Sequence, residues 1–226
     1  TIPVMHDDQH GTAIVVLAAL INATKVTNRR LKDSRVVVVG AGAAGTAVMK
    51  LLNLYAQPDI LAVDSKGIVS RHRNDLNDEK RELLNFTNKR DVSGTLKDAM
   101  NGADIFIGVS VGGLLDTRVV KTMAKNAIVI AMANPVPEIM PDEAKAAGVA
   151  VIATGRSDFP NQVNNALAFP GIFRGALDNR VSKITDKHKI AAAEAIAALV
   201  ARPTSDLIIP SVLDGRLVTA VARVIA

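Results

Sequence analysis

Arg-Val-Val-Val-Val-Gly-Ala-Gly-Ala-Ala-Gly-Thr-Ala-Val-Met-Lys, residues 35–50, is the stretch that decides the fold of this chain. Four consecutive valines at 36–39 predict a strand buried on both faces, because an unbroken apolar run suits a parallel sheet that helices cover. Three glycines follow in the G-x-G-x-x-G spacing of a dinucleotide-binding turn. From residue 43 the apolar side chains recur at helical spacing. The stretch therefore predicts a strand, a phosphate-binding turn and a helix, in that order.

Each glycine of the turn has its own physical role. Gly40 permits the tight bend, Gly42 lets the backbone approach a pyrophosphate, and Gly45 lets the helix pack closely on the strand. The unpaired N–H groups at the helix start, including those of Ala43 and Ala44, stabilise an anion. We therefore expect a nicotinamide dinucleotide at this turn.

The residues after the turn support the same cofactor. A second apolar run, 60–63, predicts a strand that ends at Asp64. This acid lies about 20 residues beyond the glycines, where the motif places a carboxylate for the adenosine ribose. Such a carboxylate favours NAD, because it accepts hydrogen bonds from both ribose hydroxyls and repels a 2′-phosphate.

Composition limits the classes of protein to which the chain can belong. Of its 226 residues 49% are hydrophobic, but there are only five Phe, one Tyr and no Trp, so the core must consist of aliphatic side chains. The absence of cysteine excludes a thiol nucleophile and thiolate metal sites. With no long apolar run and no signal peptide, we expect a cytoplasmic protein without a membrane partner. The net charge is +5, but single-strand nucleic acids need stacking aromatics, so we expect no nucleic-acid partner.

The rest of the chain continues the alternation of strands and helices. Glycines at 108–113 follow a strand, at the edge where an open α/β sheet binds its ligand, so we expect Val109 and Ser110 on the nicotinamide side; a plain turn is the alternative. The charges of 71–90 are interpreted as a solvated loop and amphipathic helix. Further strands are predicted at 105–107, 127–131 and 150–153, and helices at 12–25, 96–100, 118–125, 141–147, 166–177, 186–201 and 214–226.

These elements predict an α/β fold: a doubly wound, Rossmann-type parallel sheet with helices on both faces and a helical C-terminal part. We interpret 1–226 as a single dinucleotide-binding domain. Its parts are a leading segment and helix at 1–30, a binding core at 31–165 and C-terminal helices at 166–226. The C-terminal helices either pack on one another or cover a partner. Because the chain starts at Thr1, we expect it to be a piece of a longer protein.

Two adjacent acids, Asp7 and Asp8, precede the first predicted helix. They can supply oxygen ligands to Mg²⁺ or Mn²⁺, which need few protein carboxylates. Alternatively, one acid caps the helix and the other is solvated. The spacing alone leaves both interpretations open.

Several motifs together resemble the cofactor domain of the bacterial malic enzymes, and the resemblance covers essentially the whole chain. The first and last of them are far more specific than the glycine turn. They are Pro-Val-Met-His-Asp-Asp-Gln-His-Gly-Thr-Ala at 3–13, Gly-Ala-Gly-Ala-Ala-Gly at 40–45, Val-Asp-Ser-Lys-Gly-Ile at 63–68, Ala-Asn-Pro at 133–135, and Gly-Arg-Ser-Asp-Phe-Pro-Asn-Gln-Val-Asn-Asn at 155–165 with Phe-Pro-Gly-Ile-Phe-Arg-Gly-Ala-Leu-Asp at 169–178.

The resemblance implies a role for several polar side chains. Asp8 matches a ligand of the divalent cation, and Asp7 matches an acid close to the reacting atoms. Asn134 matches an asparagine at the cofactor and substrate site, although a turn asparagine is its plain structural interpretation. Asn164 and Asn165 match a pair from which an amide contacts malate.

The resemblance also reopens the choice of cofactor. NADP users of this family also carry an aspartate at the position of Asp64, and Ser65 and Lys66 beside it could receive a 2′-phosphate. The sequence therefore favours NAD and leaves NADP open.

The implied activity is the oxidative decarboxylation of (S)-malate to pyruvate and CO₂. The family's tyrosine acid, lysine base and two further acidic metal ligands are expected in an N-terminal catalytic domain that is absent from this chain. Its expected partners are that domain and a second subunit in a homodimer. We expect the chain alone to bind dinucleotide without turning over malate. A malolactic enzyme and a non-catalytic dinucleotide sensor are the alternatives.

Overall fold

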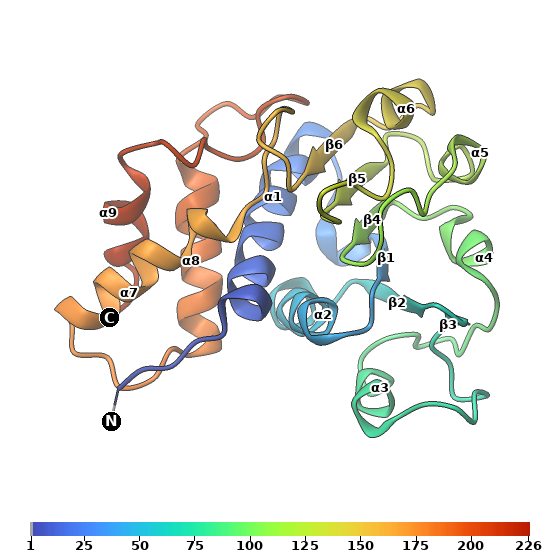
Figure 1. Cartoon of the computed structure of the whole chain (residues 1–226), viewed down its shortest axis with the longest axis horizontal. Helices are drawn as coiled ribbons and strands as arrows, with labels where there is room; N and C mark the ends of the chain where they lie inside the picture. The colour runs from blue at the N-terminus through green and yellow to red at the C-terminus, as the bar shows by residue number, and fades with distance from the viewer. Residues whose placement is uncertain (1) are drawn as a thin grey trace.

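Five parallel strands form the centre of the structure, a computed structural model that describes residues 2–226 (Figure 1). The strand order is β3-β2-β1-β4-β5-β6, and only β3 runs antiparallel to its neighbour. The predicted α/β class with a mostly parallel, doubly wound sheet is confirmed. The strands are β1 (Arg35–Val39), β2 (Asp59–Asp64), β3 (Gly67–Ile68), β4 (Ile105–Gly108), β5 (Ile128–Ala131) and β6 (Val151–Thr154).

Helices cover both faces of the sheet and extend beyond one side of it (Figure 1). None of those in residues 2–226 has both the length and the apolarity that a membrane crossing requires. The α-helices are α1 (Thr12–Val26), α2 (Ala43–Ala56), α3 (Asp78–Leu83), α4 (Leu96–Met100), α5 (Thr117–Val120), α6 (Pro141–Ala146), α7 (Phe169–Asp178), α8 (Asp186–Ala198) and α9 (Leu217–Ala222), with a π-helical turn η1 (Asp7–Gly11) and 3₁₀ turns η2 (Leu31–Asp33) and η3 (Asn165–Leu167).

The valine run of β1 contributes to two separate cores. Val36 and Val38 lie in the core that also holds residues of α1, α2 and α8, whereas Val37 and Val39 lie in the core that holds residues of α4, α5 and α6. Successive side chains of a strand point to opposite faces. All four valines are buried because helices cover both faces, which is why the run is apolar without alternation.

The C-terminal helices pack on one another and on α1. Gly171 and Gly175 let α7 approach α9 closely: a Cβ added at Gly171 would lie 2.5 Å from Val221 Cβ. Asn22 of α1 is fully buried and donates to the carbonyls of Ala197 and Ile208, each at 2.9 Å. Of the two expectations for these helices, packing on one another is thus confirmed.

Several predicted elements are wrong in extent. Helix α5 ends at Val120 instead of 125, because Thr122 and Ala124 bind the loop before β4: Gly102 N–H donates to Thr122 O, and Ala124 N–H donates to Ala103 O. The helix predicted at 214–226 covers only Leu217–Ala222. The antiparallel hairpin of β2 and β3 was not predicted from the sequence, and a strand of two residues carries no detectable periodicity.

Candidate dinucleotide-binding site

The candidate site lies where the connections from the sheet change direction. From β1 the chain passes through α2 to β2 on one side, whereas β4 lies on the other side of β1. Ligands of open α/β sheets bind in the crevice at this point, beyond the carboxyl ends of the strands. Here the glycine turn and the loop after β4 meet, since Val109 N–H donates to Val39 O at 2.9 Å.

The three glycines of the turn have different surroundings. A Cβ added at Gly45 would lie 1.8 Å from Gly40 O, and one added at Gly40, where φ is +106°, would lie 2.5 Å from Val109 O. A Cβ added at Gly42 would meet no atom within 4 Å. The outer two glycines therefore maintain close backbone packing, and the middle one leaves its side open to an incoming group.

The start of α2 faces this opening without a side-chain cap. Gly42 is its N-cap residue and has no side chain to accept from the first helical N–H groups. Gly42 and Ala43 are exposed, and Ala44 is half-buried. Unpaired N–H groups and the positive end of the helix dipole stabilise an anion at such a position.

Asp64, at the end of β2, is surrounded by cations. Arg73 donates to both carboxylate oxygens, at 2.8 and 3.1 Å, Lys80 Nζ lies 2.5 Å from Oδ2, and Lys66 N–H donates to Oδ1 at 2.9 Å. Burial alone would raise the pKa of Asp64, but the hydrogen bonds from Arg73 and Lys80 outweigh it and lower the pKa to about 2. Asp64 is therefore a carboxylate with its charge already compensated.

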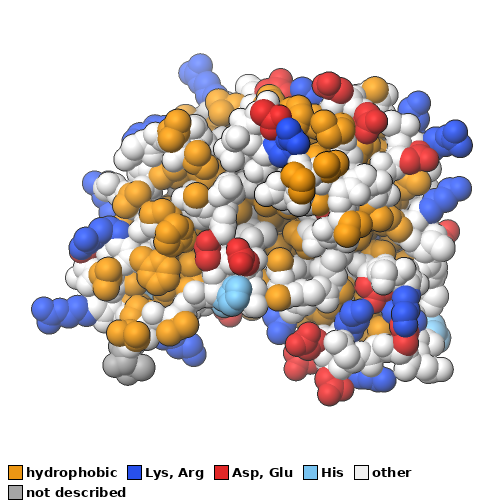
Figure 2. Space-filling view, viewed as in Figure 1, with side chains coloured by type: hydrophobic (Ala, Val, Ile, Leu, Met, Phe, Trp, Pro, Cys, Tyr) orange, Lys and Arg blue, Asp and Glu red, His pale blue; other side chains and the backbone are white. Residues whose placement is uncertain are grey.

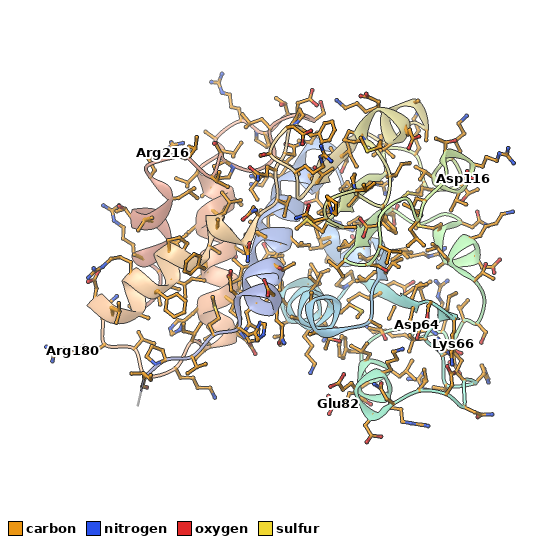
Figure 3. All side chains as sticks on the ribbon, viewed as in Figure 1. Asp64, Lys66, Glu82, Asp116, Arg180 and Arg216 are labelled. Atoms are coloured by element: carbon orange, nitrogen blue, oxygen red, sulfur yellow. The ribbon has the colours of Figure 1, made fainter. Side chains whose placement is uncertain are left out.

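The expectation that the charges of 71–90 are merely solvated is wrong for two residues. The side chains of Arg73 and Lys80 are only 15% and 26% exposed and bind Asp64. Arg73 also binds Asp75, which pairs with Lys66 Nζ at 2.9 Å. Three cations thus meet two carboxylates at the end of β2, where Figure 3 labels Asp64 and Lys66 next to each other. Ser65, in the same turn, is exposed.

The acidic pair lies in η1, directly before α1. Neither acid caps η1 or α1 through its side chain, which rules out the capping alternative. Asn165 donates from Nδ2 to Asp7 Oδ2, whereas Asp7 Oδ1 is buried and has no hydrogen-bond partner among residues 2–226. Burial first, and then the charge of Asp8, raise the pKa of Asp7. Figure 2 shows acidic and histidine side chains gathered over the start of α1, at the border of a central hollow.

Asp8 supports a metal site only as a single ligand. It is exposed, and its side chain makes no hydrogen bond or ion pair with residues 2–226. Within that range no group of three or more His, Cys, Asp or Glu side chains could hold a metal ion. Asp8 fits a hard cation chemically, but the remaining ligands would have to come from elsewhere.

The predicted asparagines are in three different situations. Asn165 is held against Asp7, although 158 positions separate them. The side chain of Asn164 accepts from Ala166 N–H at 2.9 Å and caps η3. Asn134 is exposed in the loop after β5. Only Asn165 is thus brought into contact with another predicted site residue.

Glu138 was missed by the sequence analysis. It is fully buried, and its oxygens accept from the backbone N–H groups of Ser110 and Ala133. Burial raises its pKa, although these two hydrogen bonds oppose the effect. The available signal in the sequence was a lone acid between Pro-Val-Pro and an apolar pair, which indicates burial. A buried acid needs a specific hydrogen-bond partner.

Comparisons with known proteins agree on one family. The family model described as "Malic enzyme, NAD binding domain" matches residues 9–226. The bifunctional malic/malolactic enzyme of Bacillus subtilis is 54% identical over all of this chain and 56% of its own length. A probable NADP-dependent malic enzyme of Rickettsia prowazekii is 45% identical over all of this chain and 31% of its own length.

A solved structure gives the same result. The NAD-dependent malic enzyme of Thermotoga maritima superimposes with a TM-score of 0.94 and 46% identity, over 99% of this chain and 59% of that one. This chain belongs to the malic enzyme NAD-binding domain family. It spans about half the length, or less, of the curated relatives that it matches.

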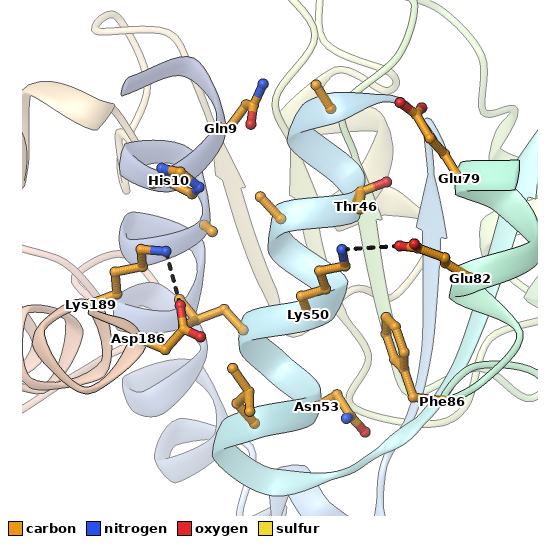
Figure 4. A pocket seen from close by; sticks show the side chains of 15 residues that line it. Gln9, His10, Thr46, Lys50, Asn53, Glu79, Glu82, Phe86, Asp186 and Lys189 are labelled. Atoms are coloured by element: carbon orange, nitrogen blue, oxygen red, sulfur yellow. Dashed lines mark hydrogen bonds and ion pairs between the residues drawn. The ribbon is translucent and has the colours of Figure 1, made fainter. Parts of the chain in front are cut away.

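This malic enzyme NAD-binding domain also has a hollow of about 580 Å³ along α2 (Figure 4). Its walls carry the ion pairs Lys50–Glu82 at 3.6 Å and Lys189–Asp186 at 2.9 Å. It includes Ala43 but none of the predicted residues at the ends of β2, β4 and β5. The hollow therefore does not coincide with the predicted dinucleotide residues at the ends of the strands.

Proposed function

We propose that the chain binds NAD or NADP across the carboxyl ends of β1, β2 and β4. The pyrophosphate rests on Gly40, Gly42, Ala43, Ala44 and Gly45. The open side of Gly42, beside an uncapped helix start, is the observation that carries this proposal.

The two ends of the dinucleotide lie on opposite sides of this turn. Its adenosine faces Asp64, and its nicotinamide faces Val109, Ser110 and Asn134. This arrangement is supported by the order of the strands, because β2 and β4 flank β1 and their ends face the same crevice.

NAD is the first proposed cofactor, with NADP as the alternative. Asp64 stands where the motif places a carboxylate for the adenosine ribose, which favours NAD. However, Arg73 and Lys80 compensate its charge, and Ser65 and Lys66 are exposed beside it, which weakens the expected repulsion of a 2′-phosphate. Titrating the chain with NADH and NADPH, followed by nicotinamide fluorescence, decides between them: at least tenfold tighter binding of NADH supports NAD, and equal binding refutes this preference.

For the whole protein we propose the oxidative decarboxylation of malate. Asp8 would hold Mg²⁺ or Mn²⁺ together with ligands from an N-terminal catalytic domain, and such a cation supplies Lewis-acid stabilisation of developing negative charge. Asp7 lies near the reacting atoms, and Asn134, Asn164 and Asn165 offer amides to malate. Family membership supports this proposal, as do the exposure of Asp8 and the unpaired oxygen of Asp7.

The chain by itself is proposed to bind dinucleotide without converting malate. Residues 2–226 contain no cluster of three metal-binding side chains, and a reaction that lacks its acid and base is slow. The test mixes the chain with malate, Mn²⁺ and NAD or NADP and follows reduced nicotinamide. Binding without turnover is expected, whereas measurable malate-dependent reduction refutes this proposal.

Malolactic activity is a second candidate. The relative from Bacillus subtilis carries both activities in its name and is 54% identical to this chain. A longer protein that contains the chain would then release lactate from malate, and product analysis separates the two reactions. Without either product, a non-catalytic dinucleotide sensor would remain. A homodimer and a cytoplasmic location stay predictions from the sequence.

A further inference from the structure

Glu138 lies behind the loops that follow β4 and β5. Its residue is 0% exposed, and the proposed chemistry does not use its carboxyl group. A buried carboxyl group is costly unless hydrogen bonds compensate for the lost water. The hydrogen-bond partners of Glu138 therefore indicate the role of its carboxyl group.

Both partners are backbone N–H groups, one from each loop. Ser110 N–H donates to Oε1 at 3.1 Å, and Ala133 N–H donates to Oε2 at 3.0 Å. Ser110 follows β4, and Ala133 follows β5 and precedes Asn134. One side chain thus connects the loop proposed for nicotinamide to the loop proposed for cofactor and substrate.

The backbone around Glu138 strengthens this connection. Gly113 N–H donates to Pro137 O, and Leu115 N–H donates to Glu138 O, each at 2.9 Å. A Cβ added at Gly108, the last residue of β4, would lie 2.3 Å from Glu138 Cδ. The carboxyl group therefore fits against the end of β4 only because residue 108 is glycine.

We propose that Glu138 is a positioning residue that holds the loops after β4 and β5 in register, so that Ser110 and Asn134 receive the nicotinamide end of the dinucleotide together. This inference rests on the proposed dinucleotide function. A carboxylate suits this position because it offers one acceptor oxygen to each N–H group. A glutamine offers only one acceptor, and its amide group would face the second N–H group as another donor.

The test compares two ligands on Glu138→Gln. NADH spans the whole site, whereas ADP-ribose lacks the nicotinamide ring and uses only the glycine turn and the end of β2. We expect the variant to bind NADH about tenfold more weakly, because a charge-assisted hydrogen bond is lost in a buried place. ADP-ribose should bind within about twofold of wild type. The shift in nicotinamide fluorescence on binding should also decrease.

Two results would overturn the inference. Equal binding of NADH by wild type and Glu138→Gln means that the carboxylate does not position the loops. An equal loss for NADH and ADP-ribose means that Glu138 serves only the fold. A wild type that binds neither ligand would instead refute the proposed function, so the two failures are distinguishable.

Glu143→Gln is the matched control, because it removes the same charge from an exposed position on α6 in the same part of the chain. It should bind both ligands as wild type does. Amide hydrogen exchange on the wild type keeps the inference testable if Glu138→Gln fails to fold. Ser110 is exposed, yet its N–H should exchange slowly because Glu138 accepts it. Rapid exchange at Ser110 contradicts the inference.

Discussion

The carboxylates of two regions, the proposed adenosine side of the site with the glycine turn and Asp64, and the acidic segment η1 with Asp7, have opposite surroundings. Asp64 accepts from two cationic side chains and one N–H group, and its pKa falls to about 2. Asp7 keeps one buried oxygen without a partner in the described part of the chain, and its pKa is raised. Within residues 2–226, both oxygens of Asp64 thus have hydrogen-bond partners, whereas only one oxygen of Asp7 does.

This difference suggests different roles for the two carboxylates. A fully satisfied carboxylate stabilises the fold, whereas a desolvated one costs stability and is retained for another reason. The comparison agrees with the proposals that Asp64 belongs to a preformed cofactor site and that Asp7 and Asp8 belong to a site that needs further ligands. The following variants test it, from the largest expected effect to the smallest.

The glycine turn should show the largest effect. Gly45→Ala places a Cβ 1.8 Å from Gly40 O, so backbone must move. We expect a loss of about 3 kcal/mol in the free energy of unfolding, because overpacking typically costs 1–3 kcal/mol and backbone yields less than a side chain. Urea unfolding measures it, and wild-type stability would contradict the tight packing of the turn.

Gly42→Ala is the matched control for that variant. It adds the same methyl group where no atom lies within 4 Å, so stability should change by less than about 0.5 kcal/mol. Its affinity for NADH should nevertheless fall roughly tenfold, because the methyl group occupies the proposed pyrophosphate position. Unchanged affinity would place the pyrophosphate elsewhere.

Asp64→Asn should have an intermediate, pH-dependent effect. At pH 7 it leaves Arg73 and Lys80 without their carboxylate, and we expect a loss of about 1–2 kcal/mol. Because the folded pKa of Asp64 is depressed to about 2, its contribution is present above the unfolded pKa near 4 and is lost as pH falls towards 2. Urea unfolding should show the difference between wild type and variant narrowing from pH 7 to pH 3. A constant difference would show that the charge of Asp64 is not responsible.

Asp7→Asn should have the smallest effect, with the opposite sign. The folded pKa of Asp7 is raised, so the ionised group destabilises the fold at neutral pH and this cost disappears below the unfolded pKa. We expect the variant to gain a few tenths of a kcal/mol at pH 7 and nothing at pH 3. Asp8→Asn removes the neighbouring charge that also raises the pKa of Asp7, so it should give a smaller gain of the same sign in thermal unfolding. A clear loss for Asp7→Asn would remove the contrast with Asp64.

Local patterns were sufficient for the central part of the fold. The valine run, the glycine spacing and Asp64 all belong to one continuous strand-turn-helix-strand unit, and the structure reproduces it from Arg35 to Asp64. Such elements follow from periodicity and turn chemistry over a few residues. The short helices were predicted less well, because tertiary hydrogen bonds end α5 before its helical pattern does.

The sequence by itself determined the class of the fold, the glycine turn between β1 and α2, and the presence of an acidic pair directly before α1, since each depends on neighbouring residues. Only the tertiary structure decided which partners the carboxylates have. Arg73 reaches Asp64 from an irregular segment and Lys80 reaches it from α3. Asn165 reaches Asp7 across 158 positions, and Glu138 connects two loops through their backbones. No periodicity encodes such contacts, because they depend on how separate strand ends come together at one edge of the sheet.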